Sequence, residues 1–155
     1  MANKNLLIVV HAPSPNTEKL LNAIVSGAAG TETNGLDINH QSPFQTGADD
    51  VLAADALILG TTENLGYMSG ALKDFFDRIY YPCLEQTQGL PYALYIRAGM
   101  DGTGTQRSVE AIVSGLRWRA VQEPLICRGE YKASFQEQCR ALGMAMAIGL
   151  DAGIF

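Results

Sequence analysis

Five short apolar runs alternate with helix-like segments along the 155-residue chain, and this alternation restricts its fold more than any other feature. The runs, which are the expected strands, are residues 5–12, 36–41, 55–62, 90–99 and 120–129. Neither a Pro/Gly/Ser-rich linker nor an internal repeat interrupts the pattern. Strands that alternate with helices in this way form a parallel sheet covered by helices on both faces. We therefore expect one α/β domain over residues 1–155.

The expected helices follow the strands. They are residues 16–30, a short piece near 49–54, and residues 69–81, 103–118 and 133–153. Gly27 or Gly30 should end the first of them. Within 72–81, apolar residues recur at i, i+3, i+4, i+7 and i+8, which is the stripe of an amphipathic helix. Spacing does not reveal the strand order, but five strands in a doubly wound sheet commonly run 2-1-3-4-5.

Composition and charge exclude several functional classes. Apolar residues make up 47% of the chain and charged residues 17%, which is typical of a globular protein rather than a disordered or fibrous one. The net charge is −5 and the chain has no basic run. Nucleic acid and anionic membrane are therefore not expected as partners.

The N-terminal apolar run is too short for a signal peptide or a membrane span, so we expect a cytoplasmic protein. The cysteines, an odd number without a close pair, should be reduced and buried; they are Cys83, Cys127 and Cys139. Neither His11 nor His40 stands at metal-ligand spacing from a cysteine or from the other histidine, so we predict no metal site.

In an open parallel sheet, ligands bind outside the carboxyl ends of the strands, near the point where the strand order reverses. That point should lie between the first and third strands here. The segments that deserve inspection are therefore residues 11–17 (the first loop), residues 60–78, whose connection up to Ser69 we call the second loop, and residues 98–106 (the third loop).

The first loop, HAPSPNT, allows two interpretations. Ser14 fits a helix N-cap and Pro15 fits the first helical position, which is an ordinary start of a helix. The N–H groups of Asn16, Thr17 and Glu18, together with nearby hydroxyls, would also suit a phosphate. The loop contains no Lys or Arg, and the lysine of a P-loop is absent. An ordinary cap and a phosphate site therefore both remain open.

The second loop is longer than most connections between a strand and a helix, and such loops are often functional. Alternatively it is a simple connection between strand and helix. Ser69 would then be the N-cap of the helix, and Thr61, Thr62 and Asn64 would be turn residues. The third loop holds three glycines within residues 99–104, which lets the backbone approach a flat ligand closely.

The segment GTTENLGYMSGALKDFFDR, residues 60–78, resembles the G-x-P-x-Y-F-G-x-x-S-G-x-L-K-x-F-x-D-R run of NAD(P)H-dependent FMN reductases and related quinone reductases, including the tryptophan-repressor-binding-protein-like group. The positions in register are Gly60, Gly66, Ser69, Gly70, Leu72, Lys73, Phe75, Asp77 and Arg78. The first loop is similar to the T/S-x-T-G-x-T phosphate pattern of the flavodoxin-like superfamily, and the resemblance covers essentially the whole chain.

This resemblance implies a flavodoxin-like three-layer sandwich with a five-stranded sheet. It also implies an FMN cofactor, NAD(P)H as reductant, a small-molecule acceptor such as a quinone or another flavin, and a homodimer or homotetramer. Because the flavin carries the chemistry, no catalytic acid or base is expected. The implied cofactor-binding residues are His11, Ser14, Asn16, Thr17, Thr61, Thr62, Glu63, Asn64, Leu65, Gly66, Tyr67, Ala98, Gly99, Asp101 and Gly102.

Some residues depart from the family pattern and keep other functions open. Pro15 replaces a glycine and Ala12 a hydroxyl residue, whereas Thr62 replaces a proline and Leu65 an aromatic residue. A flavodoxin-type electron carrier and a flavodoxin-fold domain that no longer binds FMN are the alternatives. A phosphoacceptor receiver domain is set aside, because it needs acidic residues after the first strand and an aspartate at the end of the third.

The matching helix, residues 69–81, carries charges whose roles we expect to be structural. Lys73, Asp77 and Arg78 should form ion pairs rather than act in catalysis. The aromatic stripe of residues 72–81 should be core or a subunit interface. Tyr67 would stack on the flavin ring or cover it.

Overall fold

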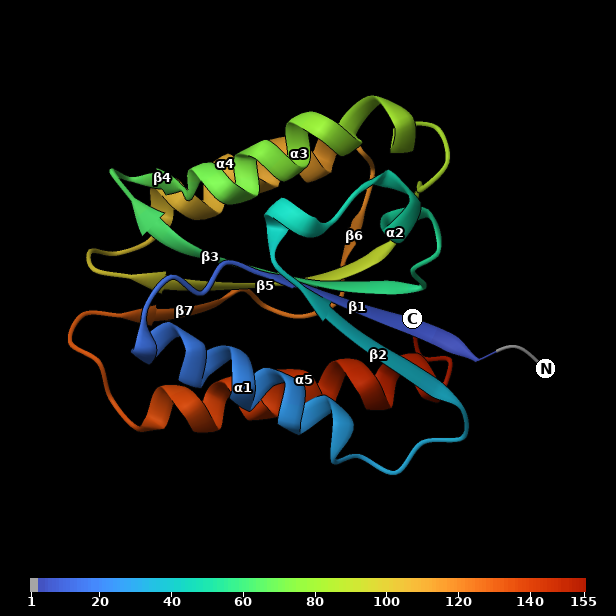
Figure 1. Cartoon of the computed structure of the whole chain (residues 1–155), viewed down its shortest axis with the longest axis horizontal. Helices are drawn as coiled ribbons and strands as arrows, with labels where there is room; N and C mark the ends of the chain where they lie inside the picture. Colours follow the sequence, from blue (N-terminus) through green and yellow to red (C-terminus); the bar gives the residue numbers. More distant parts are fainter. Residues whose placement is uncertain (1–2) are drawn as a thin grey trace.

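The computed structural model describes residues 3–155 and confirms the α/β fold (Figure 1). The strands are β1 (Lys4–Val10), β2 (Leu36–Gln41), β3 (Ala56–Asn64), β4 (Tyr67–Met68), β5 (Pro91–Ala98), β6 (Arg119–Ala120) and β7 (Leu125–Arg128). The helices are α1 (Pro15–Ala29), α2 (Ala48–Leu52), α3 (Gly70–Cys83), α4 (Thr103–Gly115) and α5 (Ser134–Asp151), with a 3₁₀ turn η1 (Pro43–Gln45).

The main sheet runs β2-β1-β3-β5, with β6 and β7 together in the next position. All of these neighbours are parallel, and Gly60 of β3 pairs with Val10 on one side and Tyr95 on the other. The predicted order 2-1-3-4-5 is therefore confirmed. The carboxyl ends of β1, β3 and β5 meet at one edge of the sheet, on the left of Figure 1, and the three predicted loops leave from that edge.

Two strands differ from the prediction. The fifth strand, predicted as residues 120–129, is split into β6 and β7 around residues 121–124. Pro124 has no N–H for the ladder, so a regular pairing with β5 cannot continue through it. The second difference is that β3 extends to Asn64 and turns back as β4, so most of the second loop is a β-hairpin.

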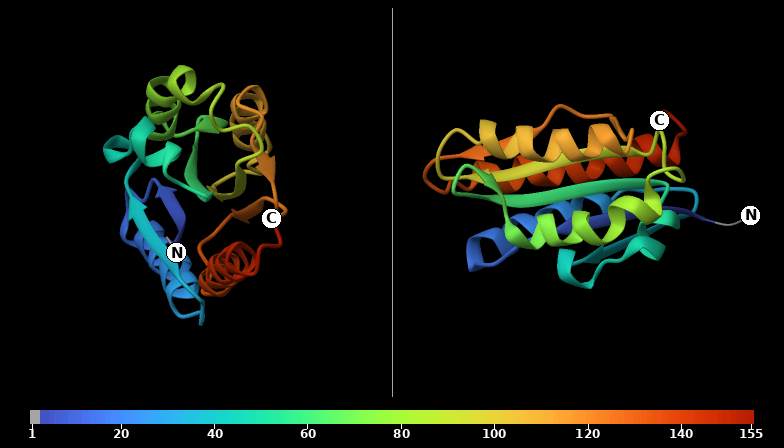
Figure 2. Two further views of the ribbon diagram at one scale, coloured as in Figure 1. Left: turned by 90° about the vertical axis from the view of Figure 1, so that its right-hand side faces the viewer. Right: turned by 90° about the horizontal axis from the view of Figure 1, so that it is seen from above.

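Helices cover both faces of the sheet, as predicted. Figures 1 and 2 show α1 and α5 on one face and α2, α3 and α4 on the other. Under α3 and α4 the core contains Phe75, Phe76 and Trp118, all buried. Under α1 and α5 it contains Leu20 and Met146 among other buried residues. These two apolar layers pack on opposite faces of the sheet and fix the strands from whose ends the three loops leave.

The aromatic stripe of α3 belongs to the core. Phe75, Phe76 and Ile79 are fully buried against the sheet, because the side of α3 that carries them faces β3 and β5. These three residues are therefore core, which was one of the two predicted roles of the stripe, and a subunit interface at the end of the stripe stays a prediction. Tyr81, at the end of the stripe, is an exception with 80% of its surface exposed.

The predictions about the cysteines and about the ion pair of Lys73 with Asp77 agree with the structure. Cys83, Cys127 and Cys139 are buried free thiols. Lys73 and Asp77 form an ion pair at 2.6 Å on the outside of α3. No helix within residues 3–155 combines the length and the apolar character that crossing a membrane requires.

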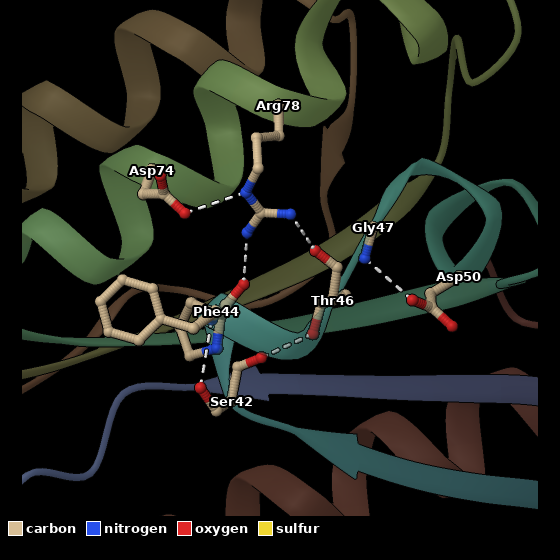
Figure 3. Close-up of polar contacts among 8 residues, drawn as sticks. Ser42, Phe44, Thr46, Gly47, Asp50, Asp74 and Arg78 are labelled. Carbon is tan, nitrogen blue, oxygen red and sulfur yellow. Dashed lines mark hydrogen bonds and ion pairs between the residues drawn. The ribbon is translucent and has the colours of Figure 1, made fainter.

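Arg78 of α3 does more than the predicted ion pairing. Figure 3 shows its guanidinium between Asp74 and the segment that follows β2. Its Nε donates to Asp74 at 2.9 Å, and its two terminal nitrogens donate to the carbonyls of Thr46 and Pro43, both at 2.7 Å. These carbonyls stand at the end and start of η1, so Arg78 fixes this turn against α3. Phe44 belongs to this turn, and its ring lies beside His11 of the first loop.

We predict that Arg78→Ala lowers the free energy of unfolding by about 2 kcal/mol, because two carbonyl acceptors lose a charged donor. The matched control is Lys73→Ala, which removes an exposed ion pair from the same helix and should change stability by less than about 0.5 kcal/mol. Urea unfolding followed by circular dichroism measures both. Equal effects of the two substitutions would contradict the role given to Arg78.

Candidate flavin site

The first loop leads from β1 into α1 through a closed capping box. Ser14 is the N-cap, and its hydroxyl oxygen accepts the N–H of Thr17 at 3.3 Å. In return, the hydroxyl oxygen of Thr17 accepts the N–H of Ser14 at 2.9 Å. Pro15 occupies the first helical position, where its fixed φ suits a helix and its missing N–H costs nothing. The predicted helix start is confirmed.

His11 connects the first loop to β3 and to η1. Its backbone N–H donates to the carbonyl of Gly60 at 3.0 Å. Its imidazole ring meets the ring of Phe44 edge-on, with 6.5 Å between the centroids. Partial burial lowers the pKa of this imidazole, because it disfavours the charged form. Phe44 is 61% exposed, and sequence reasoning missed it because only the fold brings it next to His11.

The second loop is a hairpin whose turn is strained. Leu65 and Gly66 form the turn with φ angles of 55° and 74°, between the paired residues Asn64 and Tyr67. Turns with two positive φ angles favour Asn-Gly, whereas a leucine at the first position pays a steric cost. The side chain of Leu65 is fully exposed. An apolar residue that accepts both strain and exposure is typical of a functional position.

The threonines before the turn serve the fold in different ways. The buried hydroxyl of Thr61 donates to the carbonyl of Thr62 and accepts the N–H of Ser69, both at 2.9 Å. Ser69 then caps α3 by accepting the N–H of Leu72, as predicted. The hydroxyl of Thr62 donates to Asn64 at 2.9 Å near the surface. The hydroxyl of Thr61 therefore helps to hold the start of α3, and the prediction that Thr61 binds a cofactor stays a prediction.

The hairpin rests on the first turns of α4. The hydroxyl of Thr105 donates to the carbonyl of Tyr67 at 3.0 Å, and Ser108 accepts the N–H of Met68 at 3.2 Å. Gly104 lies directly under the turn, where a Cβ atom would collide with the carbonyl of Gly66. The hairpin is thus seated on α4 by hydrogen bonds and by close backbone packing. No sequence pattern indicates this contact, because Thr105 and Ser108 are ordinary helix residues.

Glu63 ties the third loop to the hairpin. Its two carboxylate oxygens accept the N–H groups of Met100 and Gly102 at 2.7 and 2.9 Å. On the other side of the loop, Nε of Arg128 donates to the carbonyl of Asp101 at 2.7 Å. Glu63 was predicted as a site residue, but its role as an anchor for the third loop was not.

Asp101 and Gly102 begin α4. The carboxylate of Asp101 accepts the N–H and the hydroxyl of Thr103 at 3.1 and 2.9 Å. These hydrogen bonds, mainly that from the Thr103 N–H, lower the pKa of the Asp101 carboxyl. Gly102 has a φ of 74°, which explains the glycine at this position. Around Gly99 the space is open, as a closely approaching ligand would require.

The structure therefore brings the second and third predicted loops together into one unit, which we call the ring seat: residues 62–67 of the hairpin and residues 98–102. The first loop lies at the same sheet edge, and the N–H of His11 links it to Gly60. The prediction that Ser14, Asn16 and Thr17 bind a phosphate stays a prediction. Their hydroxyl and amide groups are used largely within the capping box.

A doubly wound parallel sheet with three loops gathered at its switch point defines the flavodoxin-like class of α/β proteins. Within this class, the sequence model of the NADPH-dependent FMN reductases matches residues 15–127, which is most of the chain. The chain therefore belongs to the NADPH-dependent FMN reductase family.

Individual proteins agree with this placement. A flavodoxin of Aquifex aeolicus (strain VF5) is 25% identical over 111 residues, which cover 72% of this chain and 59% of the flavodoxin. The chain thus spans less than two thirds of the length of that curated relative.

Solved structures show the same fold. An archaeal flavodoxin superposes with a TM-score of 0.79 at 18% identity, over 94% of this chain and 98% of the flavodoxin. A WrbA-like flavodoxin from Agrobacterium tumefaciens superposes with a TM-score of 0.73 at 18% identity, over 96% of this chain and 98% of the other.

The residues present fit one half of an FMN better than the other. The ring seat offers exposed apolar side chains, open space at Gly99 and a backbone held by hydrogen bonds to Glu63 and Thr105, which suit a flat aromatic ring. The first loop offers few free donors, because its capping box is closed. The ring seat therefore fits an isoalloxazine, whereas the phosphate half of the cofactor finds little that is prepared for it.

Proposed function

We propose that this protein is a flavin-dependent oxidoreductase that passes electrons from NAD(P)H to a quinone, a flavin or a similar acceptor. A bound flavin supplies the redox chemistry, since its ring accepts a hydride and passes electrons on. The observation that carries the proposal is the ring seat, in which Glu63 joins the two loops that end β3 and β5. Membership of the FMN reductase family supports it.

The chain's own residues would bind and orient the ring. Leu65 and Tyr67 on the hairpin, and Met100 on the third loop, present exposed apolar surface on the ring seat. The backbone around Gly99 and Asp101 would approach the ring edge, while Glu63 and Arg128 keep this loop in place. Ala98 is the last residue of β5 and Gly102 is the N-cap of α4, so these two residues fix the ends of the third loop. Orientation and exclusion of water are what such a site contributes.

Titration of free FMN with the purified protein tests whether a flavin binds at all. We expect saturable quenching of flavin fluorescence, and quenching should be weakened by Leu65→Asp, which places a charge where apolar contact is proposed. Absence of quenching at any protein concentration would favour the alternative of a flavodoxin-fold domain that no longer binds FMN.

A second candidate function is a flavodoxin-type electron carrier, which the flavodoxin of Aquifex aeolicus as a relative favours. A carrier receives electrons from a partner reductase, whereas a reductase accepts hydride from the nicotinamide directly. An electron carrier of this fold is expected to be more acidic and to hold a tryptophan in this loop. The net charge of this chain is only −5 and its hairpin contains no tryptophan, so we prefer the reductase.

Glu63→Ala is expected to weaken FMN binding about fivefold, because the third loop loses two hydrogen bonds to a charged acceptor that together contribute about 1 kcal/mol at an exposed site. It should also raise the reduction potential of the bound flavin, since a negative charge near the ring disfavours added electrons. Glu63→Gln keeps an acceptor and should recover part of the affinity. Unchanged affinity and potential in both variants would contradict the anchoring role.

Association of identical subunits remains a proposal from the family. A hollow of about 200 Å³ between α3 and α4 is lined by Tyr80, Tyr81 and Ile112 among other residues, and it offers a place for such a contact. Sedimentation equilibrium of the protein and of Tyr81→Glu measures the subunit number.

A further inference from the structure

The first four N–H groups of α1 determine what the first loop offers to a phosphate. A helix leaves these groups without intrahelical partners, and a phosphate at a helix N-terminus uses them. Here they belong to residues 14–17, among which Pro15 has no N–H. Those of Ser14 and Thr17 already donate to each other's hydroxyl oxygens, at 2.9 and 3.3 Å. Within the described chain, this leaves only the N–H of Asn16.

The two hydroxyls of the loop also have partners within it. The hydroxyl of Thr17 lies 3.0 Å from the carbonyl of Ser14, to which it can donate, because a carbonyl oxygen only accepts. The hydroxyls of Ser14 and Thr17 stand 2.9 Å apart, and either can be the donor in that contact. Both hydroxyl protons therefore have an acceptor within the loop.

No positive charge compensates for the missing donors. Residues 11–18 contain neither Lys nor Arg, and Glu18 adds a negative charge to the first turn of α1. Lys19 lies over the ring of Tyr131, with Nζ 5.9 Å from the centroid. His11 is mostly uncharged at neutral pH, because burial lowers its pKa. A dianionic phosphate would therefore meet the helix dipole, the N–H of Ala12 and the backbone and side-chain amides of Asn16, but no cation within residues 11–18.

From this closed capping box and from the prebuilt ring seat, we propose that the protein recognises flavins by their ring and hardly by their phosphate, so that FMN and riboflavin bind alike and exchange freely. This inference rests on the proposed function, since it assumes that a flavin binds. It makes the flavin an exchangeable ligand of the site rather than a permanently held group. The ring seat supplies the affinity because it is held by Glu63, Thr105 and Ser108 before any ligand arrives.

Parallel fluorescence titrations with FMN and with riboflavin test the inference. We expect dissociation constants that differ less than fivefold. A dissociation constant for FMN at least fivefold lower would overturn the inference and leave the proposed function intact. Binding of neither flavin would overturn both.

Ser14→Ala provides the second arm. It opens the capping box and frees the N–H of Thr17, so it should not weaken FMN relative to riboflavin. A selective loss of FMN affinity would show that the Ser14 hydroxyl holds the phosphate, and would overturn the inference. Because the substitution removes a helix cap worth about 1 kcal/mol, thermal unfolding of the variant is followed alongside. Ser14→Gly, which costs only a few tenths of a kcal/mol at an N-cap, controls for stability.

Discussion

Gly143→Ala is expected to lower the free energy of unfolding by about 2 kcal/mol, although alanine is the better helix former. Gly143 lies in α5 where this helix packs on α1, and an added Cβ would collide with the carbonyl of Ile24 and stand 3.0 Å from the N of Ala28. Both atoms are backbone, so neither can rotate away. Gly27 makes the reciprocal contact from α1, since its Cβ would collide with the carbonyl of Arg140.

Thermal unfolding of the variant measures the effect, with a fall in Tm of about 3 °C for each kcal/mol in a domain of this size. Gly70→Ala is the matched control, because Gly70 lies in the first turn of α3 with nothing within 4 Å of its added Cβ. If both substitutions left Tm unchanged, the two helices would have to separate at little cost, contrary to the close contact described above.

Gly104→Ala is expected to disturb the candidate site itself. Its Cβ would collide with the Gly66 carbonyl, and the strained hairpin turn must then lift away from α4. The hydrogen bond between Thr105 and the Tyr67 carbonyl would be lost or lengthened with it. We expect FMN affinity to fall about tenfold or more, equivalent to about 1.4 kcal/mol, with a loss of stability of about 1 to 3 kcal/mol.

Gly99→Ala is the control within the same loop, because nothing stands within 4 Å of its added Cβ. It should unfold at the same temperature as the parent protein. A Gly104→Ala variant that keeps both the parent affinity and the parent stability would show that the hairpin does not rest on α4 in solution.

The fold was predictable from the sequence because its signals are local. The apolar runs are continuous where strands are buried on both faces, as in β1, and Ser14, Ser69 and Gly30 mark helix ends that the structure confirms. The split of the last strand depends on one proline, Pro124, whose effect on pairing is visible only beside β5. Local patterns therefore predicted the order of elements better than their exact bounds.

The candidate site was predictable only as a set of loops. The hairpin was missed because a Leu-Gly turn lacks the usual Asn-Gly signal, and because its ladder has only two pairs, Glu63 with Met68 and Asn64 with Tyr67. The anchoring role of Glu63 depends on amides 37 and 39 positions away, which no sequence pattern reveals. The N-cap at Ser14 and the proline after it were predicted, but the capping box with Thr17 and the internal contacts of both hydroxyls follow only from the structure.

Anaerobic stopped-flow reduction of the flavin tests the central claim most directly. Protein mixed with FMN is exposed to NADPH or NADH, and the absorbance of the oxidised flavin is followed without any partner reductase. The account predicts that the flavin is bleached at least tenfold faster than in a protein-free control, and that Gly104→Ala slows this reaction while Gly70→Ala, outside the ring seat, does not. Quenching of FMN fluorescence without reduction by either nucleotide would contradict the account and identify an electron carrier.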